Sequence, residues 1–211
     1  MPILGYIATA VVAYLLGSIP TGFLVAKARG IDIRTVGSGN IGATNAFRIL
    51  GKGQGLLVLF GDASKGWIAV QLAAPLLAQM FAGAPENYLR ITAGVSAILG
   101  HNYTCWLGFK GGKGIATTAG VLLALVPWAL LIILGVWILL ILLTRYVSVA
   151  SIAASFVLPF ATWFTTSHDI GLTAVTGAMA FLAICKHRCN IQRLLDGTEH
   201  RIRFKKKEVA P

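Results

Sequence analysis

Long apolar runs, separated by short polar and basic segments, dominate the pattern of this chain. A transmembrane helix needs roughly 17 to 25 predominantly apolar residues. The runs that meet or approach this length are Leu4–Val25, Leu56–Met80, Ile91–Phe109, Val147–Thr166 and Ile170–Cys185. A longer stretch, Ile115–Leu143, has Pro127 near its middle. The pattern therefore predicts an all-α, polytopic integral membrane protein.

The stretch around Pro127 decides how many times the chain crosses the membrane. If Ile115–Leu143 crosses once, Arg145 and the basic C-terminal segment lie outside. If it turns at Pro127 and crosses twice, all of the 18 Lys and Arg residues except Arg90 lie on the cytoplasmic side. Because basic residues concentrate in cytoplasmic loops, we expect a hairpin of two helices of about 13 to 15 residues, which is short for a bilayer. The prediction is seven transmembrane helices, with the N-terminus outside and the C-terminus in the cytoplasm.

The chain shows no internal repeat and no linker, so we expect a single seven-helix membrane domain over residues 1–200. The first apolar run has no basic segment before it, and we therefore expect a retained span rather than a cleaved signal. Residues 201–211 form a basic cytoplasmic tail. Its charge run, Arg201–Lys207, is expected to be disordered and to face anionic lipid.

Composition supports the membrane assignment and changes how the charge is interpreted. Hydrophobic residues make up 56% of the 211 residues, charged residues only 12%, and the mean hydropathy is +0.77. A soluble domain carries about 25% charged residues. A net charge of +11 would suggest nucleic-acid binding in a soluble protein, but here basic loops facing anionic headgroups explain it. We expect membrane lipid as a partner and no nucleic acid.

The segment Gly37–Phe47 reads GSGNIGATNAF and is called the N-terminal glycine segment below. Glycine allows backbone N–H groups to turn toward an anion, and a helix that begins near Ala43 would present its positive end. A plain polar turn is the alternative, although it would not need so many glycines and donors. The polar donors in and beside the segment are Arg34, Ser38, Asn40, Thr44, Asn45 and Arg48, and its glycines are Gly37, Gly39 and Gly42.

The segment Phe109–Thr118 reads FKGGKGIATT and is called the central glycine segment. It is not a P-loop, because the GxxxxGK[ST] spacing is absent. A Gly-Gly-Lys-Gly sequence at a helix start still offers amides and an ammonium group to a phosphate. Alternatively, the basic residues only hold this loop on the cytoplasmic side of the membrane. This would explain the presence of Lys110 and Lys113, but not that of the glycines Gly111, Gly112 and Gly114.

Ionisable residues also occur inside or next to the apolar runs. Asp62 and Lys65 are three residues apart and share a helix face, so they form either an ion pair or part of a functional site. His101 and His187 lie near basic, glycine-rich segments, and a histidine there is either packed or chemically active. With 7 Asp and Glu residues in the chain, a multi-carboxylate metal site is not expected, and Lys and Arg would carry anion binding.

Three motifs in this order resemble the bacterial acyl-phosphate-dependent glycerol-3-phosphate acyltransferases. They are GSGNIGATNAF, HNYxxWLGFKGGKGIATT from His101 to Thr118, and HxxNIxRLxxGxE from His187 to Glu199. The resemblance extends to DxxKG at Asp62–Gly66 and RYVS at Arg145–Ser148, and it covers nearly the whole chain. Thr104 departs from the pattern, since proline is expected after HNY.

The resemblance implies a seven-helix protein of the bacterial inner membrane, with its motifs on the cytoplasmic face. It implies transfer of a fatty acyl group from acyl phosphate to the sn-1 hydroxyl of glycerol 3-phosphate, giving lysophosphatidic acid and phosphate. This reaction begins phospholipid synthesis and needs no cofactor. The expected partners are the two substrates, membrane lipid and, through functional coupling, the enzyme that makes acyl phosphate.

We expect direct attack of the acceptor hydroxyl, because acyl phosphate is already activated and the enzyme mainly needs to position groups and stabilise charge. Lys113 would neutralise a phosphate. His187 and the phosphate of the acceptor itself are both candidates for the general base. A covalent acyl-Ser38 intermediate is the rival scheme. The expected catalytic residues are Ser38, Lys113, His187 and Asn190, and the expected substrate-binding residues are Asn40, Gly42, Thr44, Asn45, Arg48, Lys65, Gly111, Gly112, Gly114 and Ser148, with no metal ligand.

An anion transporter is the main alternative from another class. Transporters place their polar sites near the middle of the bilayer, often on broken helices of paired repeats. In this sequence the polar residues crowd toward one membrane face and the two halves show no repeat. A structural or regulatory membrane protein is a third reading, and it leaves the glycine segments unexplained.

Overall fold

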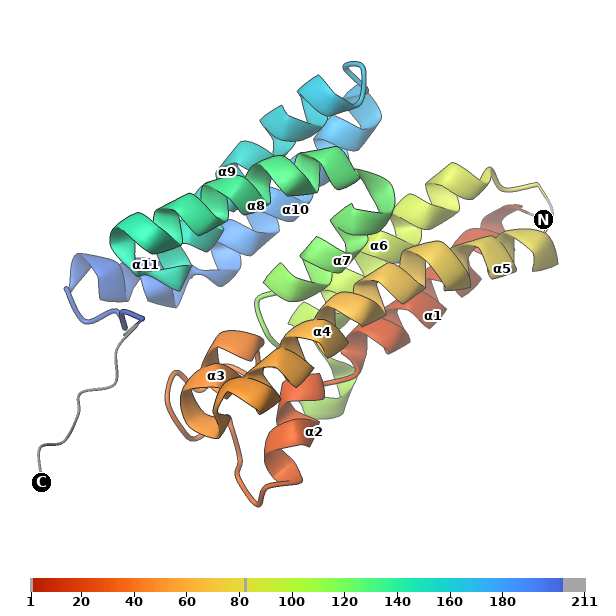
Figure 1. The fold of residues 1–211 in the computed structure, drawn as a ribbon. Coiled ribbons are helices and arrows are strands. Elements are labelled where there is room, and N and C mark those ends of the chain that lie inside the picture. Colours follow the sequence, from red (N-terminus) through yellow and green to blue (C-terminus); the bar gives the residue numbers. More distant parts are fainter. Residues whose placement is uncertain (1, 82, 203–211) are drawn as a thin grey trace, which may run out of the picture. The chain divides into compact units, whose positions relative to one another are not determined.

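A computed structural model describes residues 2–81 and 83–202. All regular structure in these ranges is helical, which confirms the all-α prediction (Figure 1). The chain forms two compact units, Met1–Pro127 and Trp128–Pro211, which are called unit 1 and unit 2. Each unit is described by itself.

Unit 1 is a helical bundle in which α1 packs along α6 and α4 packs along α7. Close backbone approach is possible because small residues lie at the contacts: a Cβ on Gly17 would collide with the backbone of Ala97, and one on Gly120 with that of Ala63. The elements are α1 (Pro2–Ser18), α2 (Thr21–Lys27), α3 (Ala43–Leu50), α4 (Lys52–Ile68), the π-helix η1 (Ala69–Ala73), α5 (Ala74–Met80), α6 (Glu86–Asn102), the 3-10 helix η2 (Cys105–Leu107) and α7 (Ile115–Leu125).

Up to residue 202, unit 2 contains three long helices and a short one. Its elements are α8 (Pro127–Thr144), which starts at the boundary, α9 (Val147–Thr165), α10 (Ile170–Lys186) and α11 (Arg188–Leu195). Helices α9 and α10 pack side by side (Figure 1). Trp137 on α8 donates a hydrogen bond of 3.1 Å to Ser151 on α9. At the end of the described chain, Ile202 bonds the carbonyl of Arg145 at 2.8 Å, and Arg201 stacks on Tyr146.

The first apolar run, expected as one continuous span, is broken at Ile19 and Pro20 between α1 and α2. Proline has no N–H to continue the helix, so nearby carbonyls need other donors. Lys65 Nζ donates to the Ile19 carbonyl at 2.8 Å, and the Thr104 hydroxyl donates to that of Ser18 at 2.6 Å. Side chains from other segments thus satisfy the break, as a backbone within a membrane requires. Thr104, the departure from the family pattern, is one of these donors.

Among the described residues, four helical segments, counted across short breaks, are long and apolar enough to cross a membrane: Pro2–Lys27, Lys52–Met80, Pro127–Thr144 and Val147–Thr165. The pair α10 and α11, bent by 52°, would add a fifth. The chain breaks at Pro127 as predicted, but α7 has 11 residues and α8 has 18, so the expectation of two similar short helices is wrong. Helix α6 ends at Asn102, earlier than the apolar run to Phe109 suggested. The seven-span count and the single domain over residues 1–200 stay predictions.

The basic tail is described only in part. Arg201 and Ile202 contact Tyr146 and Arg145, so the predicted disorder does not hold for these two residues. The remainder of the predicted tail, from residue 203 onward, lies outside the described residues.

Candidate functional site

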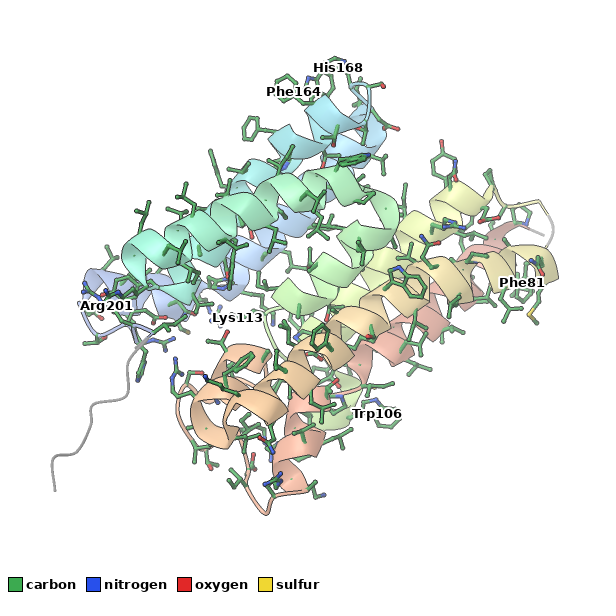
Figure 2. The ribbon with its side chains drawn as sticks, viewed as in Figure 1. Phe81, Trp106, Lys113, Phe164, His168 and Arg201 are labelled. Atoms are coloured by element: carbon green, nitrogen blue, oxygen red, sulfur yellow. The ribbon has the colours of Figure 1, made fainter. Side chains whose placement is uncertain are left out.

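Both glycine segments lie at the same end of unit 1. Leu107, in the turn that precedes the central glycine segment, packs against a buried cluster built around the N-terminal one. Trp106 lies toward this end, whereas Phe81 marks the opposite end of the unit (Figure 2). The cluster consists of Ala26, Ile33, Ile41, Ala46 and Val58. Two segments more than sixty residues apart are thereby held next to a common core.

Asn45 holds the N-terminal glycine segment together. Its side chain is 1% exposed, and its Oδ1 accepts a hydrogen bond from the Ser38 backbone N–H at 3.0 Å. Its Nδ2 lies within hydrogen-bond distance of three carbonyls, at 3.0 to 3.3 Å. These carbonyls belong to Ile33, Val36 and Asn40. Because both ends of the amide are occupied by the chain itself, Asn45 shapes the loop that surrounds it.

The N–H groups of this segment are largely used inside the protein. The Gly42 N–H binds Asn40 Oδ1 at 2.9 Å, and the Gly39 N–H binds the Val36 carbonyl at 3.0 Å. Together with Ser38, whose N–H binds Asn45, these positions have N–H groups that are bonded within the protein, so these three do not turn toward an anion as the sequence suggested. The expected short helix is confirmed: α3 begins at Ala43 without a side-chain cap.

The side chains of the segment differ in what they can offer to an anion. Thr44 and Arg48 are exposed and Ser38 is half-buried. Arg48 also donates to Asn45 Oδ1 at 3.4 Å. The Arg34 guanidinium faces Asp32, with Nη2 and Oδ2 2.7 Å apart, and its hydrogen bonds lower the pKa of Asp32 to about 2. Arg34 is therefore paired with an acidic residue. The exposed Thr44 and Arg48 and the half-buried Ser38 are the better candidates for an incoming phosphate.

Replacing Asn45 with alanine is expected to destabilise the protein by about 1–3 kcal/mol, because the buried partners of the amide lose their hydrogen bonds. The midpoint of thermal unfolding of the purified protein in detergent measures this. Asn87→Ala is the matched control, since Asn87 is exposed at the start of α6. Equal unfolding midpoints for the two variants would contradict the role given to Asn45.

The central glycine segment rests directly on the C-terminal end of α6. The Gly112 N–H donates to the His101 carbonyl at 3.0 Å. A Cβ on Gly112 would collide with the His101 ring, and one on Gly111 with the His101 carbonyl. Gly114 has φ +81°, and a Cβ there would come within 2.6 Å of Asn102 Oδ1. The sequence suggested that these glycines present amides; the structure adds that they give His101 and Asn102 room to pack on the loop.

Lys113 stands in this loop just before α7 begins at Ile115 (Figure 2). The helix has no side-chain cap, and its first turn carries the positive end of the helix dipole. An ammonium group beside a helix N-terminus is a combination that favours an anion. The geometry is compatible with the phosphate role expected for Lys113.

Asp62, Lys65 and His101 form a buried cluster of ionisable side chains. Lys65 Nζ lies 2.9 Å from Asp62 Oδ1, and His101 Nδ1 lies 3.6 Å from the same oxygen. The exposed fractions of the three side chains are 2%, 6% and 4% for Asp62, Lys65 and His101. The ion pair considered from the sequence therefore exists. The Lys65 ammonium already contacts Asp62 and the Ile19 carbonyl, an arrangement that suits a structural role better than direct substrate contact.

In unit 2, Glu199 binds two side chains of the motif that it ends. Its Oε1 accepts from Asn190 Nδ2 at 2.7 Å, and its Oε2 accepts from Arg193 Nε at 2.7 Å. Burial of the carboxyl acts to raise the pKa of Glu199, but hydrogen bonds from Arg193 and Asn190 outweigh it and lower the pKa. Glu199 thus connects Asn190 to Arg193. Sequence reasoning gave it no role, although an acid that closes a basic motif was the available signal.

His187 lies at the junction of α10 and α11 and is 3% exposed. Its Nδ1 lies 2.8 Å from the Ala183 carbonyl. A carbonyl can only accept, so Nδ1 carries a proton and Nε2 is the basic nitrogen of the neutral ring. The His187 carbonyl also accepts the Asn190 N–H at 2.8 Å. His187 and Asn190 are therefore joined by a backbone hydrogen bond within one helical turn.

Stability should depend on pH through Glu199. Because the pKa of this carboxyl is below its ordinary value of 4.5, its contribution is fully present above that pH and is lost as the pH falls below it. We expect the unfolding midpoint of the wild type to fall more steeply below pH 4.5 than that of Glu199→Gln. Thermal unfolding across this range measures the difference, and parallel curves would contradict it.

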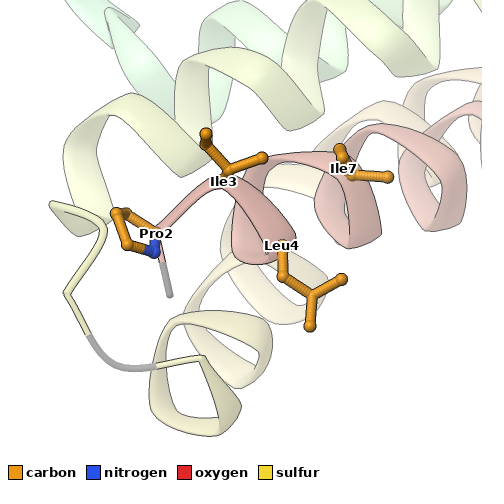
Figure 3. A pocket seen from close by; sticks show the side chains of 4 residues that line it. All are labelled: Pro2, Ile3, Leu4 and Ile7. Atoms are coloured by element: carbon orange, nitrogen blue, oxygen red, sulfur yellow. The ribbon is translucent and has the colours of Figure 1, made fainter.

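A hollow at the start of α1 is unrelated to these residues. It is lined by the apolar side chains of Pro2, Ile3, Leu4 and Ile7 (Figure 3). Its four described lining side chains offer apolar contact.

Comparison with known proteins gives consistent results. The profile of one family, described as glycerol-3-phosphate acyltransferase, matches residues 7–197. A glycerol-3-phosphate acyltransferase of Geobacter metallireducens is 50% identical over 191 residues, which cover 90% of this chain and 94% of that protein. The one from Geotalea daltonii is 47% identical over 188 residues, covering 89% and 93%.

Solved structures show the same similarity in three dimensions. The crystal structure of an integral membrane glycerol 3-phosphate acyltransferase, in its glycerol 3-phosphate form, matches with a TM-score of 0.83 at 40% identity. The match covers 94% of this chain and 96% of that one. A lysophosphatidic acid form matches with a TM-score of 0.81 at 39% identity, covering 94% and 95%.

Proposed function

This chain belongs to the glycerol-3-phosphate acyltransferase family, and from that premise we propose that it transfers a fatty acyl group from acyl phosphate to the sn-1 hydroxyl of glycerol 3-phosphate. The products are lysophosphatidic acid and inorganic phosphate. The observation that carries the proposal is the similarity, over 94% of the chain, to structures in a glycerol 3-phosphate form and a lysophosphatidic acid form. These are the acceptor and the product of the proposed reaction.

The reaction proceeds by direct attack. The acceptor hydroxyl oxygen bonds to the acyl carbonyl carbon and gives up its proton to the general base, His187 in this scheme. The bond from that carbon to the phosphate oxygen breaks, and phosphate leaves with the electron pair. Charge grows on the leaving phosphate, so fixed positive groups and donors lower the barrier. Lys113 and Arg48 supply charge, and Ser38 and Thr44 supply hydroxyl donors. Asn40, Gly42, Asn45, Gly111, Gly112 and Gly114 act through the shape of the two glycine segments.

The acceptor is bound and oriented by Ser148, His187 and Asn190. Nε2 of His187 accepts the hydrogen bond of the attacking hydroxyl, a role supported by the donation of Nδ1 to the Ala183 carbonyl. Glu199 fixes Asn190. Lys65 acts indirectly, because its ammonium is held by Asp62 and the Ile19 carbonyl.

No acyl-enzyme forms in this scheme, because acyl phosphate already carries a good leaving group. Incubation of the protein with radiolabelled acyl phosphate, without acceptor, tests this. Unlabelled protein is the expected result after denaturation. A labelled ester on Ser38 would replace direct attack by the covalent scheme.

The proposed topology is seven transmembrane helices in the bacterial inner membrane, with the N-terminus outside and the site facing the cytoplasm. The placement of the basic loops supports it. Acyl phosphate is a lipid and glycerol 3-phosphate is soluble, so the cytoplasmic membrane surface is where they can meet. The enzyme that makes acyl phosphate is the proposed functional partner.

Cysteine labelling tests this orientation. Cys189 is exposed in α11, next to the proposed acceptor residues. In a variant that keeps only this cysteine, Cys105→Ser with Cys185→Ser, a membrane-impermeant maleimide should label Cys189 only after the cells are permeabilised. Labelling in intact cells would place α11 outside and contradict the topology.

An assay in detergent tests the proposed reaction. Purified protein is given radiolabelled glycerol 3-phosphate with palmitoyl phosphate, palmitoyl-CoA or palmitoyl-acyl carrier protein. Lysophosphatidic acid should form with palmitoyl phosphate alone. Equal rates with the other donors would reject donor specificity, and no product with any donor would reject the enzymatic function. Because no vesicle is present, a transporter would give no product.

A further inference from the structure

The proposed mechanism assigns no role to the buried cluster of ionisable side chains. Asp62, Lys65 and His101 are each at least nine-tenths buried, and Asp62 and Lys65 belong to the candidate span Lys52–Met80. Ionised groups in such surroundings are costly even when paired. An apolar set of similar volume would pack α4 against α6 at lower cost. The presence of ionisable side chains here, in place of apolar ones, therefore indicates that the cluster has a function.

The cluster joins three parts of unit 1. Through Lys65 it binds the Ile19 carbonyl at the break between α1 and α2. Through Asp62 it belongs to α4. Through His101 it reaches the last turn of α6, immediately beside the central glycine segment. Of these three parts, only the one at His101 lies beside the segment that carries Lys113.

His101 contacts the glycine segment at two points. Its carbonyl accepts the Gly112 N–H at 3.0 Å, and its ring edge at Nε2 faces Gly112 so closely that a Cβ there would collide with it. The opposite ring nitrogen, Nδ1, lies 3.6 Å from Asp62 Oδ1. The imidazole thus stands between a buried carboxylate and the backbone of the residue that precedes Lys113.

We propose that Asp62 and His101 are positioning residues for Lys113. Asp62 holds the orientation of the imidazole, and the imidazole together with the His101 carbonyl fixes the backbone at Gly111 and Gly112. Lys113 is thereby presented at the start of α7. Neither residue touches substrate, so both act through the loop. This inference rests on the proposed function, in which Lys113 binds a substrate phosphate.

Steady-state kinetics in detergent test the proposal, with both substrates varied. The key comparison is between Lys113→Ala and His101→Phe, which keeps a ring but removes its polar atoms. Both variants should raise the KM of the same substrate. The expected increase is about tenfold or more, because a positioned charge contact is lost. The KM of the other substrate should stay within about twofold of the wild-type value. His101→Asn, which keeps a polar atom toward Asp62, should recover part of the loss. Asp62→Asn should shift the same KM.

Gly112 offers a second test that also works without activity. Gly112→Ala should lower the unfolding midpoint, because the new methyl group collides with the His101 ring. In the double variant His101→Ala with Gly112→Ala the collision is removed, so the double variant should be no less stable and no less active than His101→Ala alone. Coupling of this kind is what residues in contact show. Additive losses would overturn the contact on which the proposal depends.

His168→Phe is the matched control, since His168 is exposed in unit 2; it should behave as the wild type. If His101→Phe, well folded by gel filtration and thermal unfolding, changes neither KM, or changes the KM that Lys113→Ala leaves alone, the positioning role is wrong while the proposed function stands. If the wild type itself makes no lysophosphatidic acid, the proposed function fails and this inference fails with it.

Discussion

Replacing His187 with alanine is expected to lower kcat by about 10²- to 10⁴-fold, the range typical for loss of a positioned acid–base group. The KM for glycerol 3-phosphate should change much less. The physical reason is the orientation of the ring: Nδ1 is held by the Ala183 carbonyl, so Nε2 is the nitrogen that can accept from the acceptor hydroxyl. Initial rates at saturating concentrations of both substrates measure the effect.

His200→Ala is the control for this variant, because His200 is an exposed histidine close to the same helix in the sequence. It should keep the wild-type rate. A His187→Ala protein that keeps most of its kcat while its KM rises would show that the ring only binds the acceptor. The phosphate group of glycerol 3-phosphate would then be the base, the alternative that the sequence left open.

Replacing Lys113 with alanine is expected to lower kcat/KM by about 10²- to 10³-fold, as loss of a preorganised group that stabilises developing charge typically does. The ammonium stands at the N-terminus of α7, where helix dipole and side-chain charge act on the same anion. Lys113→Arg should keep part of the activity because the charge remains. Rates over a range of acyl phosphate and acceptor concentrations show which substrate the residue serves.

Lys110→Ala provides the comparison within the same loop. Lys110 is exposed and lies before the glycines that pack on α6. As a membrane-surface charge it should contribute little to turnover. Equal losses in Lys110→Ala and Lys113→Ala would mean that the loop contributes only general positive charge, and the specific role of Lys113 would be wrong.

The sequence predicted the helices well because long apolar runs have few alternatives in a membrane. It also predicted the break at Pro127. It missed the break at Pro20, since the apolar run continues through it, although proline itself was a visible signal. The length of α7 could not be predicted, because helix ends depend on the packing of the following turn as well as on hydrophobicity.

The site was predicted at the level of segments more than of single side chains. The two glycine segments were expected on one membrane side, and their shared position at one end of unit 1 agrees with this. Sequence alone shows which groups are hydrogen-bond donors, but it does not show which of them are bonded within the protein. Asn45 and the Gly112 N–H are therefore structural in this protein. Likewise, the motif from His187 to Glu199 names its residues but does not show that Asn190 and Arg193 both donate to Glu199.

The fate of the bridging oxygen of acyl phosphate tests the central claim most directly. Attack of the acceptor hydroxyl at the carbonyl carbon breaks the bond between that carbon and the bridging oxygen, so ¹⁸O placed there must leave with phosphate. With wild-type protein, labelled palmitoyl phosphate and glycerol 3-phosphate, mass spectrometry should find unlabelled lysophosphatidic acid and ¹⁸O-labelled phosphate in equal amounts. Recovery of ¹⁸O in the lipid, or the absence of lysophosphatidic acid, would contradict the account.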